Sequence, residues 1–130
     1  MATQQSRILV VDDDPAIRAV ISDALAYSDA AYEVETAVDG IDAGLKLKDF
    51  RPDLIVLDVI MPGMGGLEVC SRIRANHDLD DTKIIILTGA PEDGKAETSL
   101  VYGADLFLQK PQPIDVLLAH IEELLETNGA

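Results

Sequence analysis

The chain has 130 residues and a mass of 14.0 kDa, which is enough for one compact domain and too little for a second. Hydrophobic residues make up 48% and charged residues 26%, a composition that is typical of a folded soluble protein and excludes an intrinsically disordered chain. The 24 acidic and 10 basic residues give a formal net charge of −14, which repels phosphate backbones and anionic membranes and argues against direct nucleic-acid binding.

The cysteine content and the N-terminal residues bear on the cellular compartment. Cys70 is the only cysteine, so the chain can form neither an intrachain disulfide nor a multi-thiolate metal site. Residues 1–6 are polar and form no signal peptide, and no apolar run approaches the roughly 20 residues of a membrane span. We therefore expect a soluble, cytoplasmic protein with one domain at 7–126 and flexible ends at 1–6 and 127–130.

In the first half of the chain, short apolar runs alternate with longer amphipathic segments. The run Ile8 to Val11 predicts a buried strand, and apolar residues at helical spacing follow from Ile17 to Leu25. Tyr32 to Ala37 alternates polar and apolar residues, which is typical of a strand with one better-solvated face. Asp39 to Phe50 favours a helix, and Leu54 to Leu57 is again a buried-strand run.

The second half of the chain continues this alternation. Helical spacing runs from Leu67 to Ile73 and from Val116 to Leu124, and Glu92 to Tyr102 favours a helix by length although its pattern is less regular. Ile84 to Leu87 and Leu106 to Leu108 predict strands. Five strands alternating with five helices require parallel crossovers with helices on both faces of the sheet. The pattern predicts a single doubly wound α/β domain.

Polar residues follow the predicted strands where ligands bind in doubly wound folds, beyond the carboxyl ends of the strands. They are Asp12, Asp13 and Asp14 after the first strand, Asp58 after the third, Thr88 after the fourth and Lys110 after the fifth. Asp14 precedes Pro15 and is expected to cap the next helix. Asp58 is followed by Pro62 and three glycines, which cannot begin a helix at once, so Asp58 is expected to face the ligand crevice.

These polar residues suggest a site for a metal and a phosphate. Asp12, Asp13 and Asp58 bring like charges together at one sheet edge, which is unfavourable unless a cation compensates them. Carboxylate oxygens, a backbone carbonyl and waters suit Mg²⁺. Lys110 as a point charge and Thr88 as a hydrogen-bond donor would complete a cradle for phosphate oxygens, whereas the alternative for Lys110 is a solvated surface lysine.

Four segments in this order carry a family resemblance: ILVVDDDP, DLIVLDVIMPGMGGLEV, IIILTGA and GADLFLQKP. Together they resemble the response-regulator receiver domains of two-component signal transduction, the CheY-like family, over about residues 7–126. The resemblance implies a flavodoxin-like fold, with a five-stranded parallel sheet in the order 2-1-3-4-5 and five helices. Departures from the family pattern are modest, namely Gly65, Gly89 and the third aspartate, Asp14, and none removes a catalytic group.

The resemblance implies a role for each residue at the acidic edge. It makes Asp58 the phosphoacceptor and a ligand of Mg²⁺, for which Mn²⁺ can substitute. Asp13 is implied as a second direct ligand, Asp12 as a ligand through water, and Ile60 as a ligand through its backbone carbonyl. The phosphoryl group would come from a histidine kinase or a phosphotransfer protein, and the domain would catalyse only its own phosphorylation and dephosphorylation.

The resemblance also implies a phosphorylation switch. Lys110 and Thr88 would contact the phosphoryl oxygens, and the movement of Thr88 would leave space for the aromatic ring of Phe107. The alternative for Phe107 is a plain core aromatic, and the two roles do not exclude each other. The Lys110–Pro111 bond is expected to be cis, as this step is in the family.

Partners are implied for two surfaces. Ile17, Val20 and Pro111 correspond to the kinase-docking surface, although Ile17 and Val20 fit a core position equally well. A downstream effector would bind the face of the fourth helix, fifth strand and fifth helix. We expect a monomer or a weak, phosphorylation-dependent dimer. A stand-alone receiver, a phosphorelay shuttle and a fragment of a longer regulator all remain open.

Three alternative functions compete with the receiver interpretation. A constitutive docking module would keep the fold without the chemistry, but all five pocket residues are present. An aspartate-dependent phosphatase would need a second aspartate two residues after its nucleophile, and Asp12 with Asp14 alone supports it weakly. A nucleotide-binding module would need a glycine-rich phosphate motif after a strand, and the sequence has neither GxGxxG nor GxxxxGK[ST].

Overall fold

The structure is a computed structural model that describes residues 5–30, 32–58, 65–89 and 103–128. Five parallel strands form one sheet in the order β2-β1-β3-β4-β5. The strands are β1 (Arg7–Val11), β2 (Glu33–Ala37), β3 (Leu54–Leu57), β4 (Lys83–Thr88) and β5 (Leu106–Gln109). The order and direction of the strands confirm the doubly wound, flavodoxin-like sheet predicted from the sequence.

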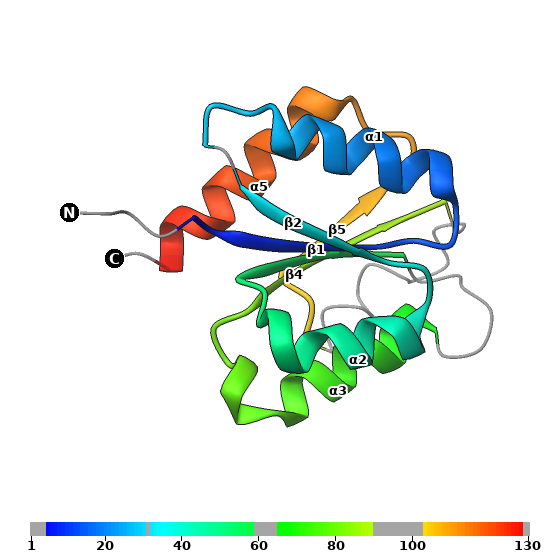
Figure 1. Ribbon diagram of the computed structural model, residues 1–130, viewed down its shortest axis with the longest axis vertical. Coiled ribbons are helices and arrows are strands. Elements are labelled where there is room, and N and C mark those ends of the chain that lie inside the picture. The colour runs from blue at the N-terminus through cyan, green and yellow to red at the C-terminus, as the bar shows by residue number, and fades with distance from the viewer. Residues whose placement is uncertain (1–4, 31, 59–64, 90–102, 129–130) are drawn as a thin grey trace.

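Helices cover both faces of this sheet. Within the described ranges they are α1 (Pro15–Ala26), α2 (Gly40–Phe50), α3 (Gly66–Ala75), the short 3-10 helix η1 (His77–Leu79) and α5 (Ile114–Asn128). Figure 1 shows α1 and α5 on one face and α2 and α3 on the other. The helix predicted at Glu92–Tyr102 lies outside the described residues. None of the described helices is long and apolar enough to cross a membrane.

The sheet separates two hydrophobic clusters, which explains why the central strands are apolar at every position. In β1, Leu9 and Val11 are buried with the residues of α2 and α3, whereas Ile8 and Val10 are buried with those of α1 and α5. Alternate side chains of a strand point to opposite faces, so a strand covered on both sides needs no polar position. The edge strand β2 has its exposed and less exposed residues in alternation, as its sequence pattern predicts.

The first helix begins as its sequence predicts. Asp14 is the N-cap of α1, and its side chain accepts a hydrogen bond from the backbone N–H of Ala16 at 2.9 Å. Pro15 occupies the first helical position, where its missing N–H costs nothing. This cap directs the chain from the end of β1 straight into α1 and keeps Asp12 and Asp13 at the edge of the sheet.

Backbone hydrogen bonds continue past the ends of the strands and place the polar residues. The N–H of Asp58, just after β3, donates to the carbonyl of Val11 in β1 at 3.0 Å. The N–H of Lys110, just after β5, donates to the carbonyl of Thr88 in β4 at 2.8 Å. Because the strands are parallel, Asp12, Asp58, Thr88 and Lys110 all meet at the same edge.

Candidate functional site

Three carboxylates gather beyond the ends of β1 and β3. One oxygen from each of Asp12, Asp13 and Asp58 lies within 4.8 Å of the others. Asp12 and Asp58 are buried, with 3% and 6% of their surface exposed, and Asp13 is open to solvent. The cluster predicted from the sequence is therefore present, with two buried carboxylates and one exposed carboxylate.

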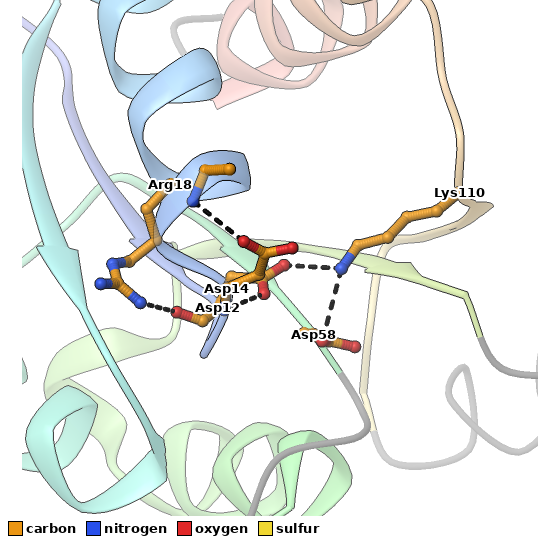
Figure 2. Close-up of polar contacts among 6 residues, drawn as sticks. Asp12, Asp14, Arg18, Asp58 and Lys110 are labelled. Atoms are coloured by element: carbon orange, nitrogen blue, oxygen red, sulfur yellow. Dashed lines mark hydrogen bonds and ion pairs between the residues drawn. The ribbon is translucent and has the colours of Figure 1, made fainter.

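Lys110 reaches the acidic cluster from the end of β5. Its Nζ lies 2.7 Å from Oδ2 of Asp12 and 3.4 Å from Oδ2 of Asp58, as Figure 2 shows. Only 19% of the Lys110 side chain is exposed, which excludes the alternative of a solvated surface lysine. The Lys110–Pro111 peptide bond is cis, as predicted.

Burial and pairing shift the pKa values of the two most closely bonded groups. Burial raises the pKa of the Asp12 carboxyl, although the hydrogen bonds from Lys110 and from the Asp14 N–H act against this shift. Burial alone would lower the pKa of Lys110, but the hydrogen bond to Asp12 and the charges of Asp58 and Asp12 outweigh it and raise the pKa. The raised pKa disfavours the charged form of Asp12 and favours the charged form of Lys110. The two paired residues differ because the Asp12 side chain is the more deeply buried.

The loop between β1 and α1 holds Asp12 at several atoms. Oδ1 of Asp12 accepts a hydrogen bond from the N–H of Asp14 at 2.9 Å, and its backbone carbonyl accepts one from Nη1 of Arg18 at 2.5 Å (Figure 2). The contact with Arg18 was missed by the sequence analysis. The sequence feature that could have indicated this contact is the spacing of six positions between Asp12 and Arg18. The first turn of α1 brings Arg18 back over the loop.

Thr88 and Phe107 lie on the same face of the sheet. Thr88 is fully buried at the end of β4, and Phe107 packs, partly buried, against the cluster on the α2 and α3 side. Phe107 pairs across the strands with Ile86, two residues before Thr88, so the ring and the hydroxyl are diagonal neighbours. This arrangement supports the core role of Phe107 and leaves its predicted switch role as a proposal.

A mostly apolar pocket of about 370 Å³ lies beside the acidic cluster, between α1 and the start of α5. It brings together the three residues that the sequence analysis assigned to docking, Ile17, Val20 and Pro111. Val20 is 59% exposed and is not a core residue, whereas Ile17 is half-buried and packs against the core. Lys110 lines the same pocket, so this surface adjoins the carboxylates directly.

The donor atoms of the acidic cluster fit a hard divalent cation. Oxygen ligands from carboxylates, completed by waters, are what Mg²⁺ takes in proteins. Asp13 is exposed and so leaves room for waters on the open side of the cluster. The fourth predicted ligand, the carbonyl of Ile60, lies outside the described residues.

Comparisons with known proteins agree with this geometry. The family model described as "Response regulator receiver domain" matches residues 8–122. The response regulators MprA of Mycobacterium sp. (strain KMS) and of Mycobacterium avium (strain 104) are each 42% identical to the chain over 119 residues, which cover 92% of the chain and 50% of those proteins. The chain thus spans about half the length of these curated relatives.

Solved structures give the same result. The chemotaxis protein CheY4 of Vibrio cholerae is 36% identical, with a TM-score of 0.85 over 93% of this chain and 99% of that one. A CheY-like receiver domain protein from Methanospirillum hungatei JF-1 is 31% identical, with a TM-score of 0.88 over 97% of this chain and 98% of that one. The chain therefore belongs to the response-regulator receiver domain family of two-component systems, as its four sequence segments predicted.

Proposed function

We propose that this receiver domain accepts a phosphoryl group on Asp58 from the phosphohistidine of a histidine kinase or a phosphotransfer protein. One observation carries the proposal: the ammonium of Lys110 bridges the buried carboxylates of Asp12 and Asp58 at the edge of the sheet. This arrangement joins a nucleophile to a fixed positive charge at the place where phosphoryl oxygens would lie. Phosphoryl transfer needs mainly such positioning and charge neutralisation.

The reaction forms one bond and breaks another. A carboxylate oxygen of Asp58 attacks the phosphorus atom, and the bond between phosphorus and the imidazole nitrogen of the donor breaks with its electron pair left on that nitrogen. Lys110 lies 3.4 Å from Oδ2 of Asp58 and would follow the phosphoryl oxygens as the acyl phosphate forms. Thr88, at the end of the neighbouring strand, would donate a hydrogen bond from its hydroxyl to a phosphoryl oxygen.

The acidic cluster would hold Mg²⁺ during this transfer, and Mn²⁺ can substitute. Asp13 and Asp58 would be direct ligands, Asp12 would bind through water, and the carbonyl of Ile60 would add a further oxygen. When bound, the cation supplies positive charge to the carboxylates and to the phosphoryl oxygens. The charge of Lys110 alone does not balance three carboxylates, which is the physical reason for a cation here.

Phosphorylation would be transmitted through Thr88 and Phe107. As the Thr88 hydroxyl moves towards the phosphoryl group, the ring of Phe107 would turn into the space released. Phe107 has no hydroxyl to hold it outside, so we propose that its inward rotamer is favoured even before phosphorylation. The output would be a change in the face formed by β5, α5 and the helix expected at Glu92–Tyr102, where an effector, or weakly a second phosphorylated copy, would bind.

The donor protein would dock on the pocket between α1 and α5. Ile17, Val20 and Pro111 give it an apolar surface, and Lys110 lines it on the side of the carboxylates. A partner seated on these residues would bring its phosphohistidine beside Asp58. We further propose that the domain works in the cytoplasm and acts on no phosphate ester other than its own acyl phosphate.

Intact mass after incubation with Mg²⁺ and acetyl phosphate tests this function. One added phosphoryl group is expected in the native chain and in Asp49→Asn, a control at an exposed position of helix α2, and none in Asp58→Asn. Phosphate released from a small phosphate ester, without modification of the protein, would favour the phosphatase interpretation. No modification by acetyl phosphate or by any phosphorylated kinase would favour a constitutive docking module.

A further inference from the structure

We propose that Arg18 is a positioning residue for the divalent cation, because it fixes the peptide that joins Asp12 to Asp13. The inference rests on the proposed Mg²⁺ site and assigns to it a residue of α1 that is not a ligand. In Figure 2 the guanidinium of Arg18 turns back from α1 and meets the carbonyl oxygen of Asp12.

The contact is a charge-assisted hydrogen bond. Nη1 of Arg18 lies 2.5 Å from the carbonyl oxygen of Asp12, and the Arg18 side chain is half-buried. Hydrogen bonds from a charged donor are stronger than those between neutral groups. Such a bond restrains the orientation of the peptide plane to which the accepting carbonyl belongs.

The restrained peptide is the one that precedes Asp13. The carbonyl of Asp12 and the N–H of Asp13 belong to a single planar unit, so holding one end holds the other. The remaining polar groups of Asp12 are held too: its N–H by Ala37, Oδ1 by the N–H of Asp14, and Oδ2 by Lys110. Asp13 itself is exposed and its carboxylate is part of the cluster, so a turn of the peptide before it would move that carboxylate.

The helix makes this arrangement rigid. The N–H of Arg18 donates to the carbonyl of the N-cap Asp14 at 3.1 Å, which is the first i→i−4 hydrogen bond of α1. The guanidinium donates to the carbonyl of Asp12, so the backbone and the side chain of Arg18 bond to the two residues that flank Asp13. A lysine there would keep the charge but lose the rigid, planar fork of donors.

The charge of Arg18 makes the inference testable, since positioning and plain electrostatics predict opposite results. A positive charge near a cation site repels the cation, so removing it should tighten Mg²⁺ binding if Arg18 acts only as a charge. Removing a residue that positions a ligand weakens metal binding, typically by about 10–100-fold for groups that orient ligands. The sign of the change therefore distinguishes the two roles.

The experiment is calorimetric titration of Mg²⁺ into the native chain, Arg18→Met and Arg18→Lys. Arg51→Met is the matched control, because it removes the same charge from an exposed position that precedes β3, away from the carboxylates. Arg18→Met is expected to raise the Kd for Mg²⁺ about tenfold, at the lower end of the range for groups that orient ligands. Arg18→Lys should lie between the native chain and Arg18→Met, and Arg51→Met should bind as the native chain does.

The outcomes separate this inference from the proposed function. If the native chain itself does not bind Mg²⁺, the proposed cation site fails, and the role of Arg18 fails with it. If the native chain binds and Arg18→Met binds equally or more tightly, the positioning role is overturned while the site stands. If circular dichroism shows that Arg18→Met does not fold, Arg18→Lys decides alone. Weaker Mg²⁺ binding by Arg18→Lys than by the native chain supports the positioning role, and unchanged binding contradicts it.

Discussion

The Nζ atom of Lys110 lies 2.7 Å from Oδ2 of Asp12, although 98 positions separate the two residues in the chain. The contact joins the end of β5 to the end of β1, across the ends of two intervening strands. It also explains how two buried carboxylates are tolerated at one sheet edge before any cation binds, since the ammonium is shared between Asp12 and Asp58.

Replacing Lys110 with methionine should therefore destabilise the metal-free domain. Removing one partner of a fully buried ion pair costs roughly 3–5 kcal/mol, and we expect about 1–2 kcal/mol here because Lys110 keeps some contact with solvent. Urea unfolding with a chelator measures the loss, and the exposed Lys48→Met is the control. Adding Mg²⁺ should reduce the loss in the free energy of unfolding that Lys110→Met causes. Equal losses in the two variants would show that Lys110 does not hold the carboxylates together.

Mg²⁺ should stabilise the native chain through the acidic cluster. A ligand that binds only the folded state at about 100 times its Kd raises the free energy of unfolding by about 2.7 kcal/mol. Asp13→Asn should lose most of this gain without destabilising the metal-free domain, because Asp13 is exposed and its charge repels the other two carboxylates. The measurement is urea unfolding with and without Mg²⁺. A full Mg²⁺ effect in Asp13→Asn would remove Asp13 from the ligands.

Two glycines should respond to alanine in opposite ways. Gly103, before β5, has φ +101°, and a Cβ there would lie 2.4 Å from Cγ of Arg74. Gly103→Ala should cost more than about 1 kcal/mol, because alanine is strained at positive φ. Gly44 is an exposed residue of helix α2, and a Cβ added there would meet nothing within 4 Å, so Gly44→Ala should gain about 0.5–1 kcal/mol. Thermal unfolding of both variants checks the pair, and a stabilised Gly103→Ala would contradict the structure.

Cys70 should be inert in the folded domain. It is fully buried in α3, and burial raises the pKa of its thiol to about 11. Because its pKa is raised, the thiol holds its proton more tightly in the folded chain than in the unfolded chain. The stability that this tighter binding contributes is present below the unfolded pKa and is lost as pH rises through about 11. Iodoacetamide at pH ~8 should modify the thiol only after the chain is unfolded in guanidinium, and intact mass measures the modification. Rapid modification of the native chain would show that the thiol is accessible.

The fold and the acidic site could be predicted because both depend on periodicity and topology. Apolar runs marked the central strands, and parallel strands bring their carboxyl ends together, so Asp12, Asp58 and Lys110 had to meet. The N-cap Asp14 followed from its place before a proline. Each of these features depends on local sequence or on the order of elements.

Side-chain contacts between elements could not be predicted in the same way. Arg74 of α3 donates to the carbonyl of Gly103 at 2.8 Å and to Asp105 at 2.9 Å, and Oδ2 of Asp105 also accepts from the N–H of Ile84. The same holds for the contact of Arg18 with Asp12. An arginine on a helix has many reachable acceptors, and only the packed position of the helix selects one of them.

Phosphorylation of Asp58 can be tested by locating the acyl phosphate chemically. After incubation with Mg²⁺ and acetyl phosphate, borohydride reduces an aspartyl phosphate to homoserine, which peptide mass spectrometry places in the sequence. We expect homoserine at position 58 in the native chain, none after incubation with a chelator, and none in Asp58→Asn. Homoserine at Asp12, Asp13 or another aspartate, with position 58 unchanged, would contradict it.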